Sequence, residues 1–167
     1  VLILEVDGLP EQVEAEAQRV EAACRESGAT EMLRAESVEA REALWRVRRG
    51  ISHALMVVAT LKLNNDIVVP KGRVPELFDL VETLKAKYGL PIPSFGHVGD
   101  GNIHVNIMVP AEDSAAVARA REAEAELFRG VVALDGAISG EHGIGFTKAP
   151  YLSLNLDAPT IAMMRRV

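Results

Sequence analysis

The chain has 167 residues, 49% of them hydrophobic, which is enough for one ordinary globular domain with its own core. Its net charge of -6 argues against nucleic-acid binding, because phosphate contacts need clustered Lys and Arg and the basic cluster here is only Arg46, Arg48 and Arg49. The single cysteine, Cys24, excludes an internal disulfide and favours a reducing, cytoplasmic location. No apolar run has the length of a transmembrane segment, which leaves peripheral membrane association of a longer protein open.

The N-terminal part of the chain predicts two strands and two helices. Residues 1–7 are apolar enough for a buried strand, and the helical spacing of the next apolar residues predicts a helix that starts at Pro10 and ends at Gly28. A short strand is expected near 31–35. Ser37 is a residue that favours a helix start, and the helix after it has an apolar stripe that reaches Val58.

The rest of the chain alternates strands with helices. Strands are expected over 66–69, 92–98, 102–109 and near 132–138, and helices over 75–88 and from Ser114, which is expected to cap it, to Gly130. The two strands joined by a short hairpin must pair antiparallel. The pattern predicts an α+β fold, a ferredoxin-like split βαβ arrangement with helices on one face of a mixed or antiparallel sheet. We expect one domain over 1–167, and the missing initiator methionine predicts that it is part of a longer chain.

Two histidines flank the hairpin in the segment His-Val-Gly-Asp-Gly-Asn-Ile-His, residues 97–104. If Asp100 and Gly101 form a two-residue turn, His97 lies directly opposite His104, with Cβ atoms about 4.5–5.5 Å apart. Alternation then places Phe95, His97, Asn102, His104 and Asn106 on one polar face, along which a ligand could lie. The histidines are either metal ligands or a solvated cross-strand pair.

A second polar segment, Ser-Gly-Glu-His-Gly-Ile-Gly at 139–145, follows the last expected strand. The Glu141 carboxylate could complete a set of two histidines and one carboxylate, which is typical of catalytic metal sites, and His142 could then act as an acid or base. Gly140 and Gly143 either shape the loop or let a ligand approach its backbone closely. Their spacing matches neither a dinucleotide fingerprint nor a Walker loop.

Both segments resemble signature segments of the C-terminal half of flavin-linked oxidases and dehydrogenases of 2-hydroxy acids, the group that includes D-lactate dehydrogenase, the glycolate oxidase flavoprotein subunit and D-2-hydroxyglutarate dehydrogenase. The resemblance implies that His97, His104 and Glu141 hold a divalent metal, expected to be zinc, and that His142 takes the substrate hydroxyl proton. It further implies that the substrate is contacted by Arg48, which follows the helix residue Trp45, and by Ser52, Lys62, Asn102 and Asn106. The family also has a lysine near the following strand, and either Lys62 or Asn64 occupies its place here.

The reaction that the resemblance implies is oxidation of an R-2-hydroxy acid to the 2-oxo acid with hydride transfer to FAD. An N-terminal domain outside this chain would bind most of the FAD, with Gly140 and Gly143 as further cofactor contacts. The other expected partners are an electron-acceptor protein and a second copy of the protein in a homodimer. One alternative is a stand-alone metallohydrolase, because two histidines and a carboxylate with a nearby base also suit water activation. The other is a non-catalytic module that binds a small acid and in which the metal is structural or absent.

Overall fold

The computed structural model describes residues 1–166, so Val167, the last residue of the expected domain, lies outside the described chain. The described residues divide into two compact units, Val1–Ile51 and Ser52–Val167, which are treated separately below. The expectation of one domain stays a prediction.

The first unit consists of helices and extended segments. Helix α1 (Pro10–Glu26) starts at a proline, which suits the first turn of a helix, and α2 (Val38–Ala54) starts after Ser37, whose Oγ accepts a hydrogen bond from the Ala40 N–H at 3.1 Å. Both predicted helices are therefore confirmed. The predicted strands at 1–7 and near 31–35 are wrong, since neither segment belongs to a strand in the described chain. An apolar segment becomes a strand only where a neighbouring strand pairs with its backbone groups.

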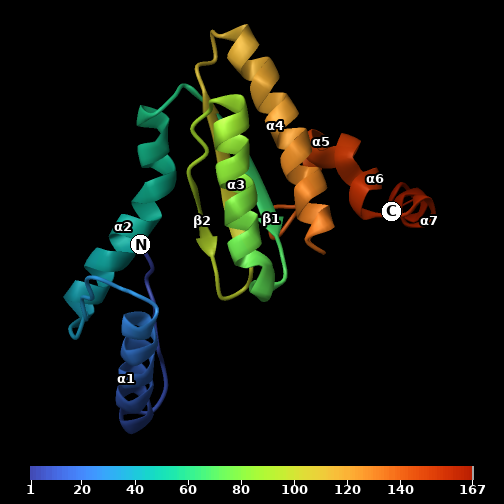
Figure 1. The fold of residues 1–167 in the computed structure, drawn as a ribbon. Helices are drawn as coiled ribbons and strands as arrows, with labels where there is room; N and C mark the ends of the chain where they lie inside the picture. Colours follow the sequence, from blue (N-terminus) through green and yellow to red (C-terminus); the bar gives the residue numbers. More distant parts are fainter. Residues whose placement is uncertain (167) are drawn as a thin grey trace. The chain divides into compact units, whose positions relative to one another are not determined.

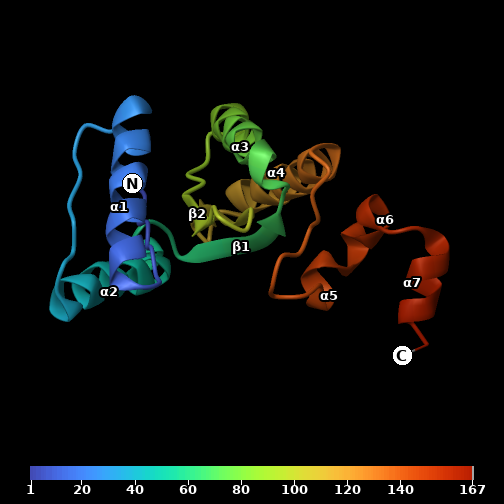
Figure 2. The same cartoon turned by 90° about the horizontal axis from the view of Figure 1, so that it is seen from below.

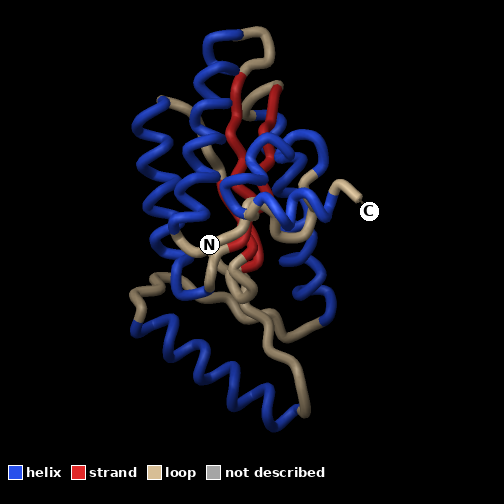
Figure 3. The backbone as a smooth tube through the Cα atoms, turned by 90° about the vertical axis from the view of Figure 1, so that its right-hand side faces the viewer, coloured by secondary structure: helices blue, strands red, loops and turns tan. Residues whose placement is uncertain are grey.

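The second unit contains a three-stranded antiparallel sheet in the order β1-β3-β2, formed by β1 (Leu61–Val68), β2 (Ser94–His97) and β3 (Asn102–Val109). Helix α3 (Val74–Tyr88) connects β1 to β2 (Figure 1), and β3 then enters between them, which is a split βαβ unit. Figure 3 shows the strands in red and the helices in blue. Helix α4 (Ser114–Ala133) follows β3. The prediction of an α+β fold with an antiparallel sheet is confirmed.

Two predicted features of α4 need correction. The residue that caps α4 is Asp113 rather than Ser114, because the Asp113 carboxylate accepts the Ala116 N–H at 2.9 Å. The strand expected near 132–138 is reduced to a single antiparallel bridge between Val68 and Ala137. The α4 helix continues through Ala133 because Val131 is buried in the core in the helical conformation and the partly buried Val132 packs against that core.

Helices α3 and α4 cover one face of the sheet and form the core with it. Figure 2 shows both helices on the same side of β1, and α5 (Gly145–Lys148) on the other side. The fully buried core residues include Leu77 and Leu84 of α3, Leu127 and Phe128 of α4, and Ile103, Val105 and Ile107 of β3. The opposite face of the sheet carries Lys62, Asn64 and Asp66 of β1 and Asn102, His104 and Asn106 of β3. After α5 the chain ends in the short turns η3 (Ala149–Tyr151), α6 (Leu152–Asn155) and α7 (Ala158–Met164).

The hairpin between β2 and β3 differs from the prediction by two residues. The loop has four residues, 98–101, so that His97 lies opposite Asn102 and Phe95 lies opposite His104. A two-residue turn of the predicted type needs a positive φ at both central residues, and Asp100 is not among the described residues with a positive φ. Because the shift is an even number of residues, the predicted polar face keeps all its members.

None of the helices in residues 1–166 is both long enough and apolar enough to cross a membrane.

Candidate active site

Four polar side chains from two strands and a loop gather on the polar face of the sheet. They are Asp66 of β1, His104 of β3, and Glu141 and His142 of the loop before α5, and each offers a metal-binding atom within 4.8 Å of the others. Asp66 and His104 are buried, whereas Glu141 and His142 are exposed. The cluster is therefore anchored on the sheet and open toward the loop.

The strand register explains why Asp66 and His104 meet. They are directly opposite each other in the β1–β3 ladder, so both side chains project from the same face. Asp66 Oδ1 lies 3.5 Å from His104 Nδ1, and the other ring nitrogen of His104, Nε2, lies 3.6 Å from Glu141 Oε1. His104 thus connects the buried carboxylate with the exposed one.

Aromatic rings surround His104. The His142 ring stacks on it with a centroid distance of 5.3 Å, His97 makes an edge contact at 6.0 Å, and Phe95 lies at 5.6 Å. The prediction placed His97 opposite His104, but His97 pairs with Asn102, two residue pairs nearer to the loop, and it is exposed. His97 therefore lies beside the four-residue cluster without being one of its members.

The loop with Glu141 and His142 is held against β1 by Asp66. Oδ2 of Asp66 accepts three consecutive backbone N–H groups, from Gly140 at 3.0 Å and from Glu141 and His142 at 2.8 Å each. The buried Lys148 of α5 donates to the Asp66 carbonyl oxygen at 2.6 Å, which fixes the end of the same segment. One residue of β1 thus receives hydrogen bonds from both ends of the loop.

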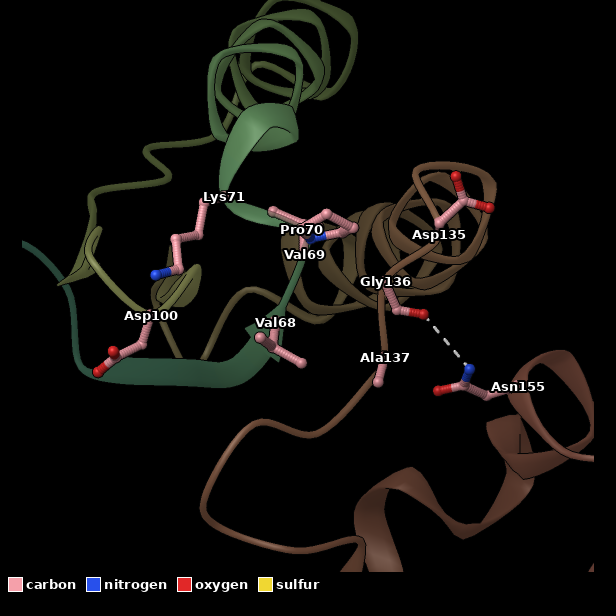
Figure 4. Close-up of a pocket in the computed structure, with 9 residues that line it drawn as sticks. All are labelled: Val68, Val69, Pro70, Lys71, Asp100, Asp135, Gly136, Ala137 and Asn155. Carbon is pink, nitrogen blue, oxygen red and sulfur yellow. Dashed lines mark hydrogen bonds between the residues drawn. The ribbon is translucent and has the colours of Figure 1, made fainter.

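A second anchor holds the start of this segment. Asn155 of α6 accepts the Ile138 N–H at 3.0 Å and donates to the Gly136 carbonyl oxygen at 3.3 Å (Figure 4). These groups border an open depression of about 620 Å³ that is lined by Val68, Val69, Pro70, Lys71, Asp100, Asp135, Gly136, Ala137 and Asn155. None of the four residues of the cluster lines this depression.

Burial and hydrogen bonding set the charge states of the buried groups. Burial alone would raise the pKa of Asp66, but the N–H groups of His142 and Glu141 and the charges of His142 and Lys148 hold that pKa below its ordinary value. Burial lowers the pKa of His104, and the nearby Asp66 carboxylate only partly offsets this. The cluster therefore combines a carboxylate with a neutral imidazole near neutral pH.

The donor set fits a divalent cation. Imidazole nitrogens and carboxylate oxygens are ligands that zinc takes in proteins. Asp66 Oδ1 and His104 Nδ1 are buried without a hydrogen-bond partner among the described residues, so the centre of the cluster has unused polar atoms.

The other predicted site residues fall into three places. Asn106 is fully buried, and its amide accepts from Asn64 and donates to the carbonyl oxygens of Pro93 and His104. Ser52 and Lys62 contact each other, with Lys62 Nζ 2.8 Å from Ser52 Oγ. Arg48 belongs to the first unit, Val1–Ile51, whereas the four-residue cluster belongs to the second.

Asn102 packs against the loop. A Cβ atom at Gly140 would lie 2.7–2.9 Å from three atoms of the Asn102 amide, and Asn102 is buried. Glycine at position 140 therefore has a packing reason that is independent of any cofactor. Gly143 has a positive φ of 78° and no neighbour within 4 Å of such a Cβ. The proposed cofactor contacts of both glycines stay predictions.

We expect Gly140→Ala to lower the free energy of unfolding by about 1–3 kcal/mol, because the added methyl group must displace the buried Asn102 amide. In the Asn102→Ala background the same change should cost much less. A double-mutant cycle by urea unfolding measures this coupling. Additive effects of the two changes would contradict the packing explanation.

The sequence prediction missed Asp66 and Lys148. Asp66 was placed at the start of an apolar strand, and its charge within Asp-Ile-Val-Val was the available signal. A charged residue is rarely buried in a strand without a partner. Its partners, however, come from β3 and from a loop 74–76 residues further along the chain.

Comparison with known proteins assigns the chain to a family. The model of a family described as FAD linked oxidases, C-terminal domain, matches residues 1–167. The chain belongs to this family. This FAD linked oxidase C-terminal domain is 34% identical over 165 residues to the glycolate oxidase subunit GlcD of Bacillus subtilis, a match that covers 99% of the chain. It is 30% identical over 166 residues to a probable mitochondrial D-lactate dehydrogenase of Danio rerio, covering 98% of the chain.

A D-2-hydroxyglutarate dehydrogenase of Xanthomonas citri pv. viticola is 37% identical over 128 residues, which cover 74% of this FAD linked oxidase C-terminal domain. The domain spans only about a third of the length of these relatives, 35% of the first, 33% of the second and 27% of the third. The family resemblance inferred from the two sequence segments is confirmed.

Proposed function

We propose that this chain is the substrate- and metal-binding part of an FAD-dependent enzyme that oxidises an R-2-hydroxy acid to the corresponding 2-oxo acid. The observation that carries the proposal is the cluster of His104, Glu141 and His142 on the polar face of the sheet, in a member of the FAD linked oxidase family. The relatives named above for glycolate, D-lactate and D-2-hydroxyglutarate support the substrate class.

In this proposal His97, His104 and Glu141 hold a divalent ion, zinc being the expected one. The edge contact between the rings of His97 and His104, with 6.0 Å between their centroids, supports this pair of ligands, although His97 lies outside the four-residue cluster. When bound, the ion would supply Lewis-acid polarisation of the substrate hydroxyl, and FAD would supply the hydride acceptor.

The proposed proton acceptor is His142. Its Nε2 lies 3.7 Å from Glu141 Oε1, and its side chain is 55% exposed, so a ligand can reach it. Neutral imidazole is a suitable base near neutral pH. The backbone N–H of His142 donates a hydrogen bond to Asp66, and the ring of His142 stacks on that of His104. Both contacts keep His142 over the polar face.

The substrate carboxylate is proposed to meet basic and polar groups. Arg48 would form a bidentate clamp, which lysine cannot reproduce. Lys62 lies on the same face of β1 as Asp66, because side chains alternate along a strand, and Ser52 holds its ammonium group. Asn102 and Asn106 would contact the substrate or orient its neighbours, and Gly140 and Gly143 would approach the cofactor.

The proposed partners are an N-terminal FAD-binding domain, an electron-acceptor protein and a second copy of the protein. Two thirds of the length of the relatives lies outside the matched region, which is enough for a separate FAD-binding domain. A cytoplasmic location is proposed because the lone Cys24 suits a reducing compartment.

A spectral screen of the chain together with its FAD-binding region tests the proposal. We expect an R-2-hydroxy acid to bleach the flavin absorbance under anaerobic conditions, and its S enantiomer to leave the absorbance unchanged. His142→Gln should slow this reduction by about 100-fold or more, the usual contribution of a general base. His53→Gln, at an exposed histidine outside the cluster, is the matched control.

Two outcomes would reject the proposed reaction, and a third would reject the proposed base. Binding of the acid without flavin reduction would indicate a binding module, and turnover with the metal alone would indicate a metallohydrolase. An unchanged rate in His142→Gln would exclude His142 as the base.

A further inference from the structure

Asp66 uses its two carboxylate oxygens for two different tasks. Its side chain is 1% exposed, and Oδ2 is saturated by three backbone N–H donors of the loop. Consecutive backbone N–H groups that converge in this way form an anion-binding nest. Here the anion is a side chain of the protein itself, so the backbone from which Glu141 and His142 project is tied to β1.

The second oxygen, Oδ1, faces His104. It lies 3.5 Å from Nδ1, and each of the two atoms is buried without a hydrogen-bond partner within residues 1–166, so the other is the nearest polar group with which it can pair. A buried carboxylate oxygen can only accept, so the proton of the neutral imidazole is favoured on Nδ1. The lone pair is then on Nε2, the nitrogen that faces Glu141 Oε1 at 3.6 Å.

We propose that Asp66 is a positioning residue that selects the His104 tautomer and fixes the 140–142 backbone, so that His104 Nε2, Glu141 and His142 converge on one ligand. The inference rests on the proposed function for the identity of that ligand, but the tautomer is a property of this chain alone. A carboxylate that orients a histidine through its other nitrogen raises metal affinity by about 10–100-fold in known metal sites.

Asp66→Asn separates the two tasks. An asparagine amide has only one oxygen acceptor. The three N–H donors of the loop and the single Nδ1–H donor of His104 would compete for that oxygen. We therefore expect the amide oxygen to stay with the loop and the NH₂ group to face His104 Nδ1. The imidazole proton must then move to Nε2, which removes the lone pair that faces Glu141, while the loop keeps its anchor.

The test is nitrogen-15 NMR of the histidine rings in the whole chain at pH 8, with His104→Gln to assign the His104 signals among the four histidines. We expect the Nδ1–H tautomer in the wild type and the Nε2–H tautomer in Asp66→Asn. Zinc titration should show affinity lowered by about 10–100-fold in Asp66→Asn. Asp100→Asn, which removes the same charge from an exposed loop residue, should match the wild type in both measurements.

A wild-type His104 with its proton on Nε2 would overturn the proposal even if Asp66→Asn fails to fold. An unchanged tautomer in a folded Asp66→Asn would also overturn it. If the tautomer switches as expected but the wild type neither binds zinc nor reduces flavin, the proposed function fails while the positioning role of Asp66 stands.

Discussion

Gly101→Ala is expected to lower the free energy of unfolding by about 3 kcal/mol or more. Gly101 has a positive φ of 75°, where an L-residue pays about 1–2 kcal/mol. A Cβ atom there would also overlap the carbonyl oxygen of Val69, and backbone cannot move away as a flexible side chain can. The Gly101 carbonyl oxygen meanwhile accepts the Val69 N–H at 3.0 Å, so the loop and the end of β1 are locked together.

Gly99→Ala is the matched control, two positions earlier in the same loop. Gly99 has no positive φ, and nothing lies within 4 Å of a Cβ placed on it. Its replacement should change the free energy of unfolding by less than about 1 kcal/mol. The change should be an increase, because alanine gives the unfolded chain less conformational entropy than glycine does. Urea unfolding of both variants measures the difference. Equal stability of the two variants would contradict the role given to the contact between Gly101 and Val69.

His104→Ala is expected to reduce the affinity of the chain for zinc by more than about 100-fold, beyond the 10–100-fold typical of a residue that only supports a ligand. The reason is its central position, since His104 lies within reach of Asp66, Glu141, His142 and His97. Isothermal titration with zinc measures the affinity, and metal analysis of the purified chain measures the occupancy.

Two further variants identify the remaining ligands. His53→Ala changes an exposed histidine outside the cluster and should leave zinc binding unchanged. His97→Ala should weaken binding if His97 is a ligand as proposed. Unchanged binding in His97→Ala with a loss in His142→Ala would instead assign the ion to the four-residue cluster. Unchanged metal binding in both His97→Ala and His104→Ala would remove the metal proposal.

The helices were predictable because their signals are local. Pro10, Ser37 and Pro75 each mark a helix start that the structure has within one residue. The spacing of Leu77, Leu80, Val81 and Leu84 also predicted an inward face of α3, on which Leu80 is only partly buried and the other three are buried. Such signals depend on residues one or two turns apart and need no distant partner.

The strands were less predictable because a strand depends on its neighbour. The apolar segment at 1–7 has no partner strand in the described chain, and the valines near 132 continue a helix instead of forming a strand. The hairpin was correctly located, but its register depended on how the loop packs on Val69. That contact is long-range in the chain and left no local signal.

The sequence by itself determined which side chains share the polar face of β3, because alternation along a strand does not depend on the partner strand. It also determined that Glu141 and His142 lie in a glycine-flanked loop. Only the tertiary structure decided that Asp66 lies opposite His104 and that the loop returns to the same carboxylate. Both contacts join residues far apart in the chain, and their geometry depends on strand register and on the packing of α4 and α5, which no local pattern specifies.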